Sequence, residues 1–147
     1  AAEAHRAGQA VVYRLESSRE VAARGEKFDA VTCMEMLEHV ADPAAVLRDI
    51  HALLKPGGWA FFSTVNRTVK ARLGVICAAE YVLRLVPQGT HQYDWFIKPA
   101  ELARMVTRAG LTPVAFCGMD YLPLRQSARL SRHLDINYLF AARKEAA

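Results

Sequence analysis

The chain has 147 residues, of which 52% are hydrophobic and 23% are charged. This length and composition are typical of one globular domain with a sizeable core, and they exclude an intrinsically disordered chain. The formal net charge is only +4 and the basic residues are dispersed. The sequence therefore predicts no nucleic-acid binding, and it allows only a mild attraction to anionic surfaces.

The cysteines and the apolar stretches indicate the compartment. Cys33, Cys77 and Cys117 are far apart and match neither a zinc site nor a disulfide framework, which favours a reducing compartment. Residues 1–10 lack the apolar core of a secretory signal. The longest apolar stretch, near residues 73–79, is far shorter than the ~20 residues that a membrane-spanning helix needs. We expect a soluble, cytoplasmic protein that at most associates with a membrane.

The N-terminal third predicts alternating strands and helices. Residue 1 is expected to lie inside a helix, and the β-prone run at residues 11–15 follows it. The serines after this run, beginning with Ser17, are typical of a helix start, and Gly25 ends that helix. Residues 28–34 are β-prone and almost continuously apolar, which is typical of a buried strand in a parallel sheet.

The same alternation continues to the C-terminus. Asp42 followed by Pro43 is typical of an N-cap with proline at the first helical position, and this helix is expected to reach residue 54. A Lys-Pro-Gly-Gly turn then leads into a strand at residues 59–64. Further patterns predict helices at residues 69–86 and 99–109, and strands at 111–117 and 136–141. Short connections between strands and helices predict an α/β fold with a mostly parallel sheet.

Ligands of such a sheet bind beyond the carboxyl ends of its strands. Glu16 follows the first predicted strand, residues 34–40 follow the second, and Asn66 and Arg67 follow the third. These positions are the first candidates for a binding site.

Three side chains at residues 34–40 are competent to bind a metal ion. If the segment forms one helical turn, Glu35, Glu38 and His39 share a face, because they are spaced i,i+3 and i,i+4. Two carboxylates and an imidazole suit magnesium, manganese or zinc. The same spacing is common among solvated polar residues, with His39 bonded to the backbone, and spacing alone favours this plainer interpretation.

Longer strings of residues resemble a known family. Residues 28–40 (FDAVTCMEMLEHV), followed by LKPGG at residues 54–58, are similar to class I methyltransferases. The strings TCMEMLEHV at residues 32–40 and FFSTVNR at residues 61–67 resemble the ubiquinone-biosynthesis O-methyltransferases more specifically. Segments of the same family are matched near residues 79–81, 86–91, 96–102 and 135–138.

The resemblance implies a class I, Rossmann-like α/β fold with a last antiparallel strand. Residues 1–147 would be the C-terminal part of one such domain, without the family's glycine-rich cofactor loop. The implied reaction is methyl transfer from S-adenosyl-L-methionine to a phenolic hydroxyl of a polyprenylated quinone precursor. Met34 matches a position that contacts the cofactor, and Glu16 is a second candidate for that contact, although an acidic residue at a helix start explains it equally well.

The resemblance also implies roles in catalysis. Glu35, Glu38 and His39 match the ligands of a divalent cation, with magnesium as the candidate, in related quinone methyltransferases. Such an ion could acidify the phenol, or His39, beside Glu38, could remove the proton as a general base. The sequence leaves this choice open. His91 is a lower-ranked candidate.

Residues 67–90 are predicted to be a lid or a membrane-contact segment. The segment combines several basic residues with apolar bulk, which suits an amphipathic helix at an anionic membrane surface. The resemblance also implies peripheral binding to the inner membrane and association with other ubiquinone-biosynthesis proteins. The alternatives are a methyltransferase for another small phenol, or a non-catalytic module that binds a membrane or a partner.

Overall fold

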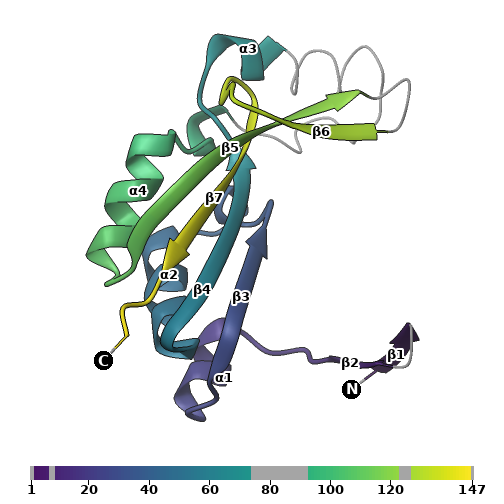
Figure 1. The fold of residues 1–147 in the computed structure, drawn as a ribbon, viewed down its shortest axis with the longest axis vertical. Coiled ribbons are helices and arrows are strands. Elements are labelled where there is room, and N and C mark those ends of the chain that lie inside the picture. Colours follow the sequence, from purple (N-terminus) through teal and green to yellow (C-terminus); the bar gives the residue numbers. More distant parts are fainter. Residues whose placement is uncertain (1, 7–8, 74–92, 123–126, 147) are drawn as a thin grey trace.

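The fold is given by a computed structural model, which describes residues 2–6, 9–73, 93–122 and 127–146. One five-stranded sheet dominates it, with strands in the order β3-β4-β7-β5-β6 (Figure 1). These strands are β3 (Phe28–Met34), β4 (Leu54–Val65), β5 (Thr112–Leu122), β6 (Ser127–Ser131) and β7 (Asn137–Arg143). The helices are α1 (Ser18–Ala23), α2 (Pro43–Leu53), α3 (Val69–Ala71) and α4 (Pro99–Arg108).

The α/β class and the last antiparallel strand are confirmed, and the sheet is mixed. Among the described strands, only β3 and β4 pair in parallel. The last strand, β7, lies between β4 and β5 and is antiparallel to both, so that β3, β4 and β5 all run in the same direction. The edge strand β6 forms an antiparallel hairpin with β5. It was not predicted, because the strand is short and its side chains are mostly polar or small and exposed.

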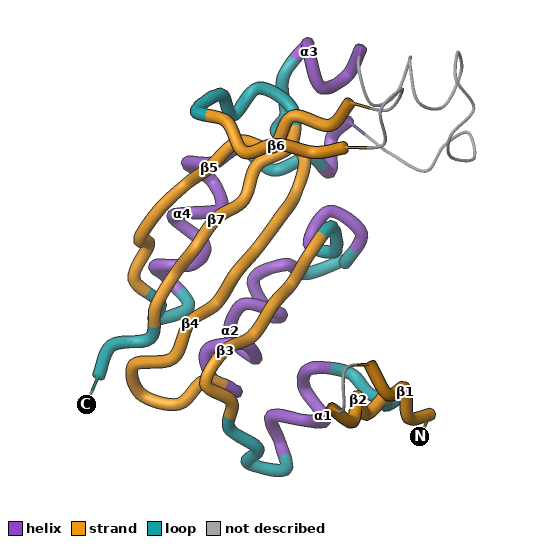
Figure 2. The backbone as a smooth tube through the Cα atoms, turned by 45° about the vertical axis from the view of Figure 1, so that its right-hand side comes forward, coloured by secondary structure: helices purple, strands orange, loops and turns teal. Residues whose placement is uncertain are grey.

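The first residues of the chain differ from the prediction. A separate antiparallel hairpin is formed by β1 (Ala2–Arg6) and β2 (Gln9–Tyr13), so the expected helix at the start is wrong. The β-prone run was identified, but it pairs only with β1 and lies outside the main sheet (Figure 2). Local β propensity predicts a strand without specifying its partner, which explains this error.

Helix ends follow the predicted capping chemistry. The Ser17 hydroxyl accepts from the Glu20 backbone N–H at 3.3 Å, and the Glu20 carboxylate accepts from the Ser17 N–H at 2.7 Å. This reciprocal capping box begins α1. Asp42 begins α2 by accepting from the Ala45 N–H at 3.0 Å. Both helix starts are therefore confirmed.

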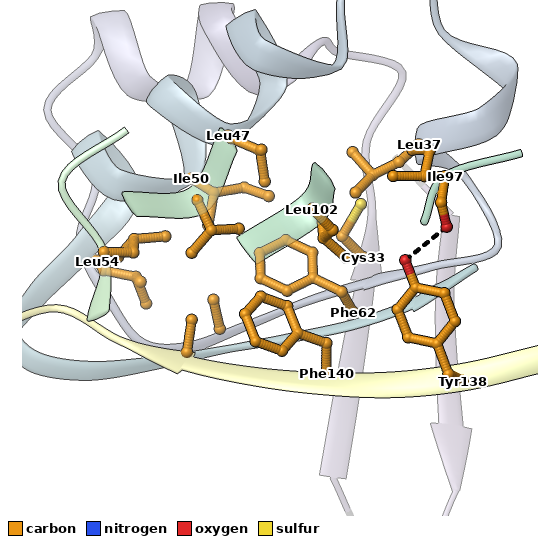
Figure 3. Packing of buried hydrophobic residues seen from close by; sticks show 14 residues of the cluster. Cys33, Leu37, Leu47, Ile50, Leu54, Phe62, Ile97, Leu102, Tyr138 and Phe140 are labelled. Atoms are coloured by element: carbon orange, nitrogen blue, oxygen red, sulfur yellow. Dashed lines mark hydrogen bonds between the residues drawn. The ribbon is translucent and has the colours of Figure 1, made fainter. Parts of the chain in front are cut away.

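The core lies on one face of the sheet. In Figures 1 and 2 helices α2 and α4 lie behind the strands, on the same side. Figure 3 shows Phe62 and Phe140 stacked, with a centroid separation of 5.9 Å, against Leu102 of α4 and Ile50 of α2. Beside them the buried Tyr138 hydroxyl donates to the Ile97 carbonyl at 2.9 Å. Among the described helices, none is long and apolar enough to cross a membrane.

The other face of the sheet carries no described helix. It holds an apolar groove of about 390 Å³ lined by side chains such as those of Thr32, Met34, Phe61, Cys117 and Leu139. Phe61 and Met34 are exposed on it, whereas their chain neighbours Phe62 and Cys33 are buried against the helices. Alternation along each strand therefore gives the two faces different surroundings.

Gly118 tests how closely β5 approaches the backbone at His133. A Cβ atom at this position would lie 1.8 Å from the backbone oxygen of His133, so Gly118→Ala requires a shift of backbone. We expect it to lower the free energy of unfolding by about 3 kcal/mol. Gly25→Ala is the control, because Gly25 has a positive φ of 75° but no neighbour within 4 Å, and it should cost about 1 kcal/mol. Urea unfolding would measure both variants. If both lost the same free energy of unfolding, the close approach of Gly118 to the His133 backbone would be contradicted.

Candidate active site

The candidate site begins where β3 ends. Cys33 and Met34 pair with Phe62 and Ser63 of β4, and the Glu35 N–H continues the ladder by donating to the Ser63 carbonyl at 3.0 Å. Glu35 then adopts the left-handed conformation, with φ of 47°. This geometry is rare for a residue with a long side chain and costs of order 1 kcal/mol, and it is often found at functional sites.

The expected helical turn at residues 34–40 is only partly present. A 3₁₀ turn, η1 (Leu37–His39), contains Glu38 and His39. Glu35 lies outside it, because its backbone is still bonded to β4. The prediction that the three side chains share one face of a helix is therefore wrong.

Glu38 is the buried carboxylate of the site. It is 4% exposed, and its Oε2 accepts a hydrogen bond from the Thr64 hydroxyl at 2.9 Å. The other oxygen, Oε1, is buried without a hydrogen-bond partner. Burial raises the pKa of Glu38 above its ordinary value; hydrogen bonding from its own backbone N–H and from the Thr64 hydroxyl opposes this shift, and the Glu35 charge adds to it.

The other two candidate ligands are more exposed. Glu35 and His39 are both exposed, and the Asn137 amide donates to Glu35 Oε2 at 3.4 Å. Within residues 2–6, 9–73, 93–122 and 127–146, no group of three His, Cys, Asp or Glu side chains is arranged to hold a metal ion. The resemblance to metal-binding relatives is thus not matched by a three-ligand arrangement in this conformation.

The predicted cofactor contacts lie apart from each other. Met34 is 49% exposed at the end of β3, on the face of the sheet that lacks described helices. Glu16 follows the separate hairpin and forms an ion pair with Arg24 at 2.5 Å. The structure thus places Glu16 away from the end of a main-sheet strand, because β2 does not join that sheet. His91 lies outside the described residues.

A cleft of about 670 Å³ opens on the helix-covered side of the strand ends. Glu38 and His39 line it from η1, Arg67 lines it from the end of β4, and Glu101 and Arg104 line it from α4. Apolar side chains complete the lining, among them Leu37, Val40, Trp95, Phe96, Ile97 and Met105. An apolar cavity with a few convergent polar groups is the usual form of a small-molecule site.

Arg67 is anchored within this cleft. Its Nη2 donates to Glu101 Oε2, and the same oxygen accepts from the Lys98 N–H at 3.2 Å at the start of α4. The Nε of Arg67 is buried and has no hydrogen-bond partner.

Sequence reasoning named Arg67 as a strand-end residue but assigned it no role, and it missed Thr64 and Glu101. Glu101 stands three residues into a predicted helix, where a carboxylate commonly caps the helix start. This position was the sequence feature from which Glu101 could have been predicted.

Comparison with known proteins identifies the family. The family described as a methyltransferase domain matches residues 2–115. The ubiquinone biosynthesis O-methyltransferase of Thiobacillus denitrificans is 52% identical over 143 residues, which cover 97% of this chain and 62% of that protein. The protein of the same name from Bordetella pertussis is 54% identical over 138 residues, which cover 93% of this chain and 57% of that protein. The chain thus spans about three-fifths of the length of these curated relatives.

Solved structures agree on the fold. A SAM-dependent methyltransferase from Thermotoga maritima, described as a possible histamine N-methyltransferase, superposes with a TM-score of 0.57 at 18% identity, covering 82% of this chain and 58% of that one. The magnesium protoporphyrin IX methyltransferase of Synechocystis, solved with bound SAH, gives a TM-score of 0.53 at 18% identity, covering 85% and 48%. With the family match extending over most of its residues, the chain belongs to the methyltransferase domain family.

Proposed function

We propose that the protein acts in S-adenosyl-L-methionine-dependent O-methylation of phenolic hydroxyls on polyprenylated quinone precursors in ubiquinone biosynthesis. The curated relatives with this function in their name are about half identical over nearly the whole chain. The structural observation that carries the proposal is Glu38, a buried carboxylate with an unpartnered oxygen, which lines a largely apolar cleft. A phenol offers that oxygen the donor it lacks.

The residues present fit one part of a site for S-adenosyl-L-methionine. When bound, this molecule supplies a methyl group activated by a positively charged sulfur. The exposed Met34 at the end of β3 offers an apolar contact for it. Glu16 fits less well, because its carboxylate is engaged by Arg24. The candidate magnesium site is not formed, so no step is assigned to a metal ion.

Glu38 is the candidate base for the phenolic proton. Its buried Oε1 has no hydrogen-bond partner, and the hydrogen bond from Thr64 to Oε2 orients the carboxylate. Burial makes this carboxylate more basic than one in water, as a general base requires. His39 is adjacent in the same turn and lines the same cleft, so it is the second candidate base.

The remaining work is alignment of the two reactants. Holding them in the correct geometry contributes roughly 7–11 kcal/mol in favourable cases. Trp95, Phe96 and Ile97 supply an apolar wall from the segment before α4, and Met105 adds to it from that helix. This wall suits an aromatic ring. A methyltransferase for another small phenol would use the same groups, but the names of the relatives favour the quinone precursor.

Membrane contact remains a proposal for residues 67–90. Of these, residues 74–90 lie outside the described part of the chain. In the described part, Val69 and Leu73 are exposed, and Lys70 and Arg72 stand between them. This mixture of apolar and basic side chains supports contact with an anionic membrane, and association with other ubiquinone-biosynthesis proteins is proposed with it.

Methyl transfer is the direct test. We would measure transfer of labelled methyl groups from S-adenosyl-L-methionine to a short-tailed prenyl catechol, both with this chain and with a hybrid in which it replaces the matching part of the Thiobacillus denitrificans relative. We expect labelled methyl ether from the hybrid. Glu38→Gln should lower the rate about 100-fold or more, because the acceptor for the proton is lost. A hybrid without activity would refute the proposal.

Addition of EDTA to the same hybrid tests the metal question. We expect an unchanged rate, because the three candidate ligands do not form a metal site in the described structure. A rate that falls with EDTA and returns with magnesium would show that Glu35, Glu38 and His39 rearrange around an ion.

Glu38 should also make stability depend on pH. Because its pKa is raised by burial, the folded state holds this proton more tightly than the unfolded state. The stabilising effect of protonation is complete below the ordinary carboxyl pKa and is lost as pH rises through the raised pKa. Glu38→Gln should therefore lose less stability than the wild type as pH rises, and melt at a higher temperature at neutral pH. Thermal melts of both proteins at several pH values test this. If the melting temperatures of wild type and Glu38→Gln changed in parallel with pH, the prediction would be contradicted.

Co-sedimentation tests the membrane proposal. We expect the chain to pellet with anionic vesicles at low salt and to be released as ionic strength rises, since the contact depends on basic residues. Neutral vesicles are the control. A chain that stays in the supernatant with anionic vesicles would contradict the contact.

A further inference from the structure

Two buried polar atoms in the described side chains lack any hydrogen-bond partner, and both belong to residues that line the same cleft. They are Glu38 Oε1 and Arg67 Nε. One is an acceptor and the other is a donor. Leaving such an atom unpaired typically costs about 1–3 kcal/mol, so it is uncommon in a folded protein unless a water or a ligand completes it.

These two groups do not neutralise each other. Glu38 is held by Thr64 through its other oxygen, and Arg67 is paired with Glu101. Glu101 is held in turn by the backbone at the start of α4. The guanidinium therefore has a fixed partner on one side while its Nε hydrogen is left for something else. Guanidinium groups donate in a rigid fork, which makes them selective for the position of an oxygen.

We propose that Arg67 positions the substrate by donating from Nε to a second oxygen on the ring whose hydroxyl Glu38 receives. This inference rests on the proposed function and adds to it a residue that distinguishes a dihydroxy ring from a simple phenol. A monohydroxy ring would satisfy Glu38 and leave Arg67 unpaired. A site with a buried, unpaired donor discriminates against a ligand that lacks the matching oxygen.

The neighbours of Arg67 support this assignment. Ser63, Thr64, Val65 and Asn66, which precede it, are all buried, and the Val65 carbonyl accepts from the Ile97 N–H at 3.1 Å. The backbone that carries Arg67 is therefore fixed against the segment that supplies the apolar wall. Arg104 and Arg108 also line the cleft, but neither has a buried nitrogen without a partner.

The test compares binding of free catechol and free phenol. Dissociation constants would be measured by NMR titration of the 147-residue chain, without S-adenosyl-L-methionine. We expect the wild type to bind catechol about tenfold more tightly than phenol, as one charge-assisted hydrogen bond allows. Arg67→Lys should bring this ratio close to one, because lysine keeps the charge but cannot hold Glu101 and a second oxygen in the same fork.

Two further variants separate positioning from a structural role. Arg104→Lys is the matched control in the same cleft and should keep the wild-type ratio. Glu101→Gln should lower the ratio partly, because its amide oxygen still accepts from Lys98 but holds the guanidinium less firmly. A structural role for Arg67 would weaken both ligands equally and leave the ratio unchanged, which would overturn the proposal. A wild-type ratio of one would also overturn it, and would mean that water occupies both atoms.

Failure of this inference and failure of the proposed function are distinguishable. Methyl transfer by the hybrid with an unchanged ratio in Arg67→Lys would refute the role of Arg67 alone. A ratio that depends on Arg67 in the 147-residue chain, together with a hybrid that transfers no methyl group, would refute the enzymatic function and leave the contact between Arg67 and a ring oxygen supported.

Discussion

The site depends on the parallel register between β3 and β4. Pairing of Cys33 with Phe62 and of Met34 with Ser63 brings the ends of the two strands together. Glu38 then follows the end of β3, while Thr64 lies near the end of β4 and Arg67 follows it. A shift of this register by one residue would turn Thr64 toward the opposite face of the sheet and remove the donor that orients Glu38. Local hydrogen bonds at the site thus rest on the long-range pairing of two strands.

Burial accounts for the chemistry of the cleft. In water, a carboxylate and a guanidinium are satisfied by solvent and carry little specificity. Here the same groups are largely removed from solvent and each is held by one protein partner, Thr64 or Glu101. Each retains one unsatisfied atom, and this arrangement is less stable than a fully paired one. The cleft adjoins the core, because Leu37 and Ile97 line it and also belong to the buried cluster.

The sequence predicted much of the fold because local signals and tertiary structure agree. The caps at Ser17 and Asp42 and the apolar run at residues 28–34 predicted the corresponding elements. Pairing was harder to predict. The run at residues 11–15 carries no information about its partner, and β6 has too few apolar residues to be recognised.

In the candidate site, the local geometry differs from the one that the spacing indicated. The i,i+3 and i,i+4 pattern assumes a regular helix, and the hydrogen bond from Glu35 to Ser63 keeps that residue in the sheet. Arg67 and Glu101 are 34 residues apart, so their ion pair follows only from the tertiary fold. The proposed role of Glu38 rests on its burial, which no local pattern reveals.

The short segment between Met34 and Glu38 lies between two hollows of the protein surface. Met34 lines the groove on one face of the sheet, and Glu38, four residues later, lines the cleft at the strand ends. Direct methyl transfer needs the methyl carbon and the phenolic oxygen about 3 Å apart, so in the proposed function both reactants have to meet where β3 ends. The backbone from Met34 to Glu38 would then set the distance between them.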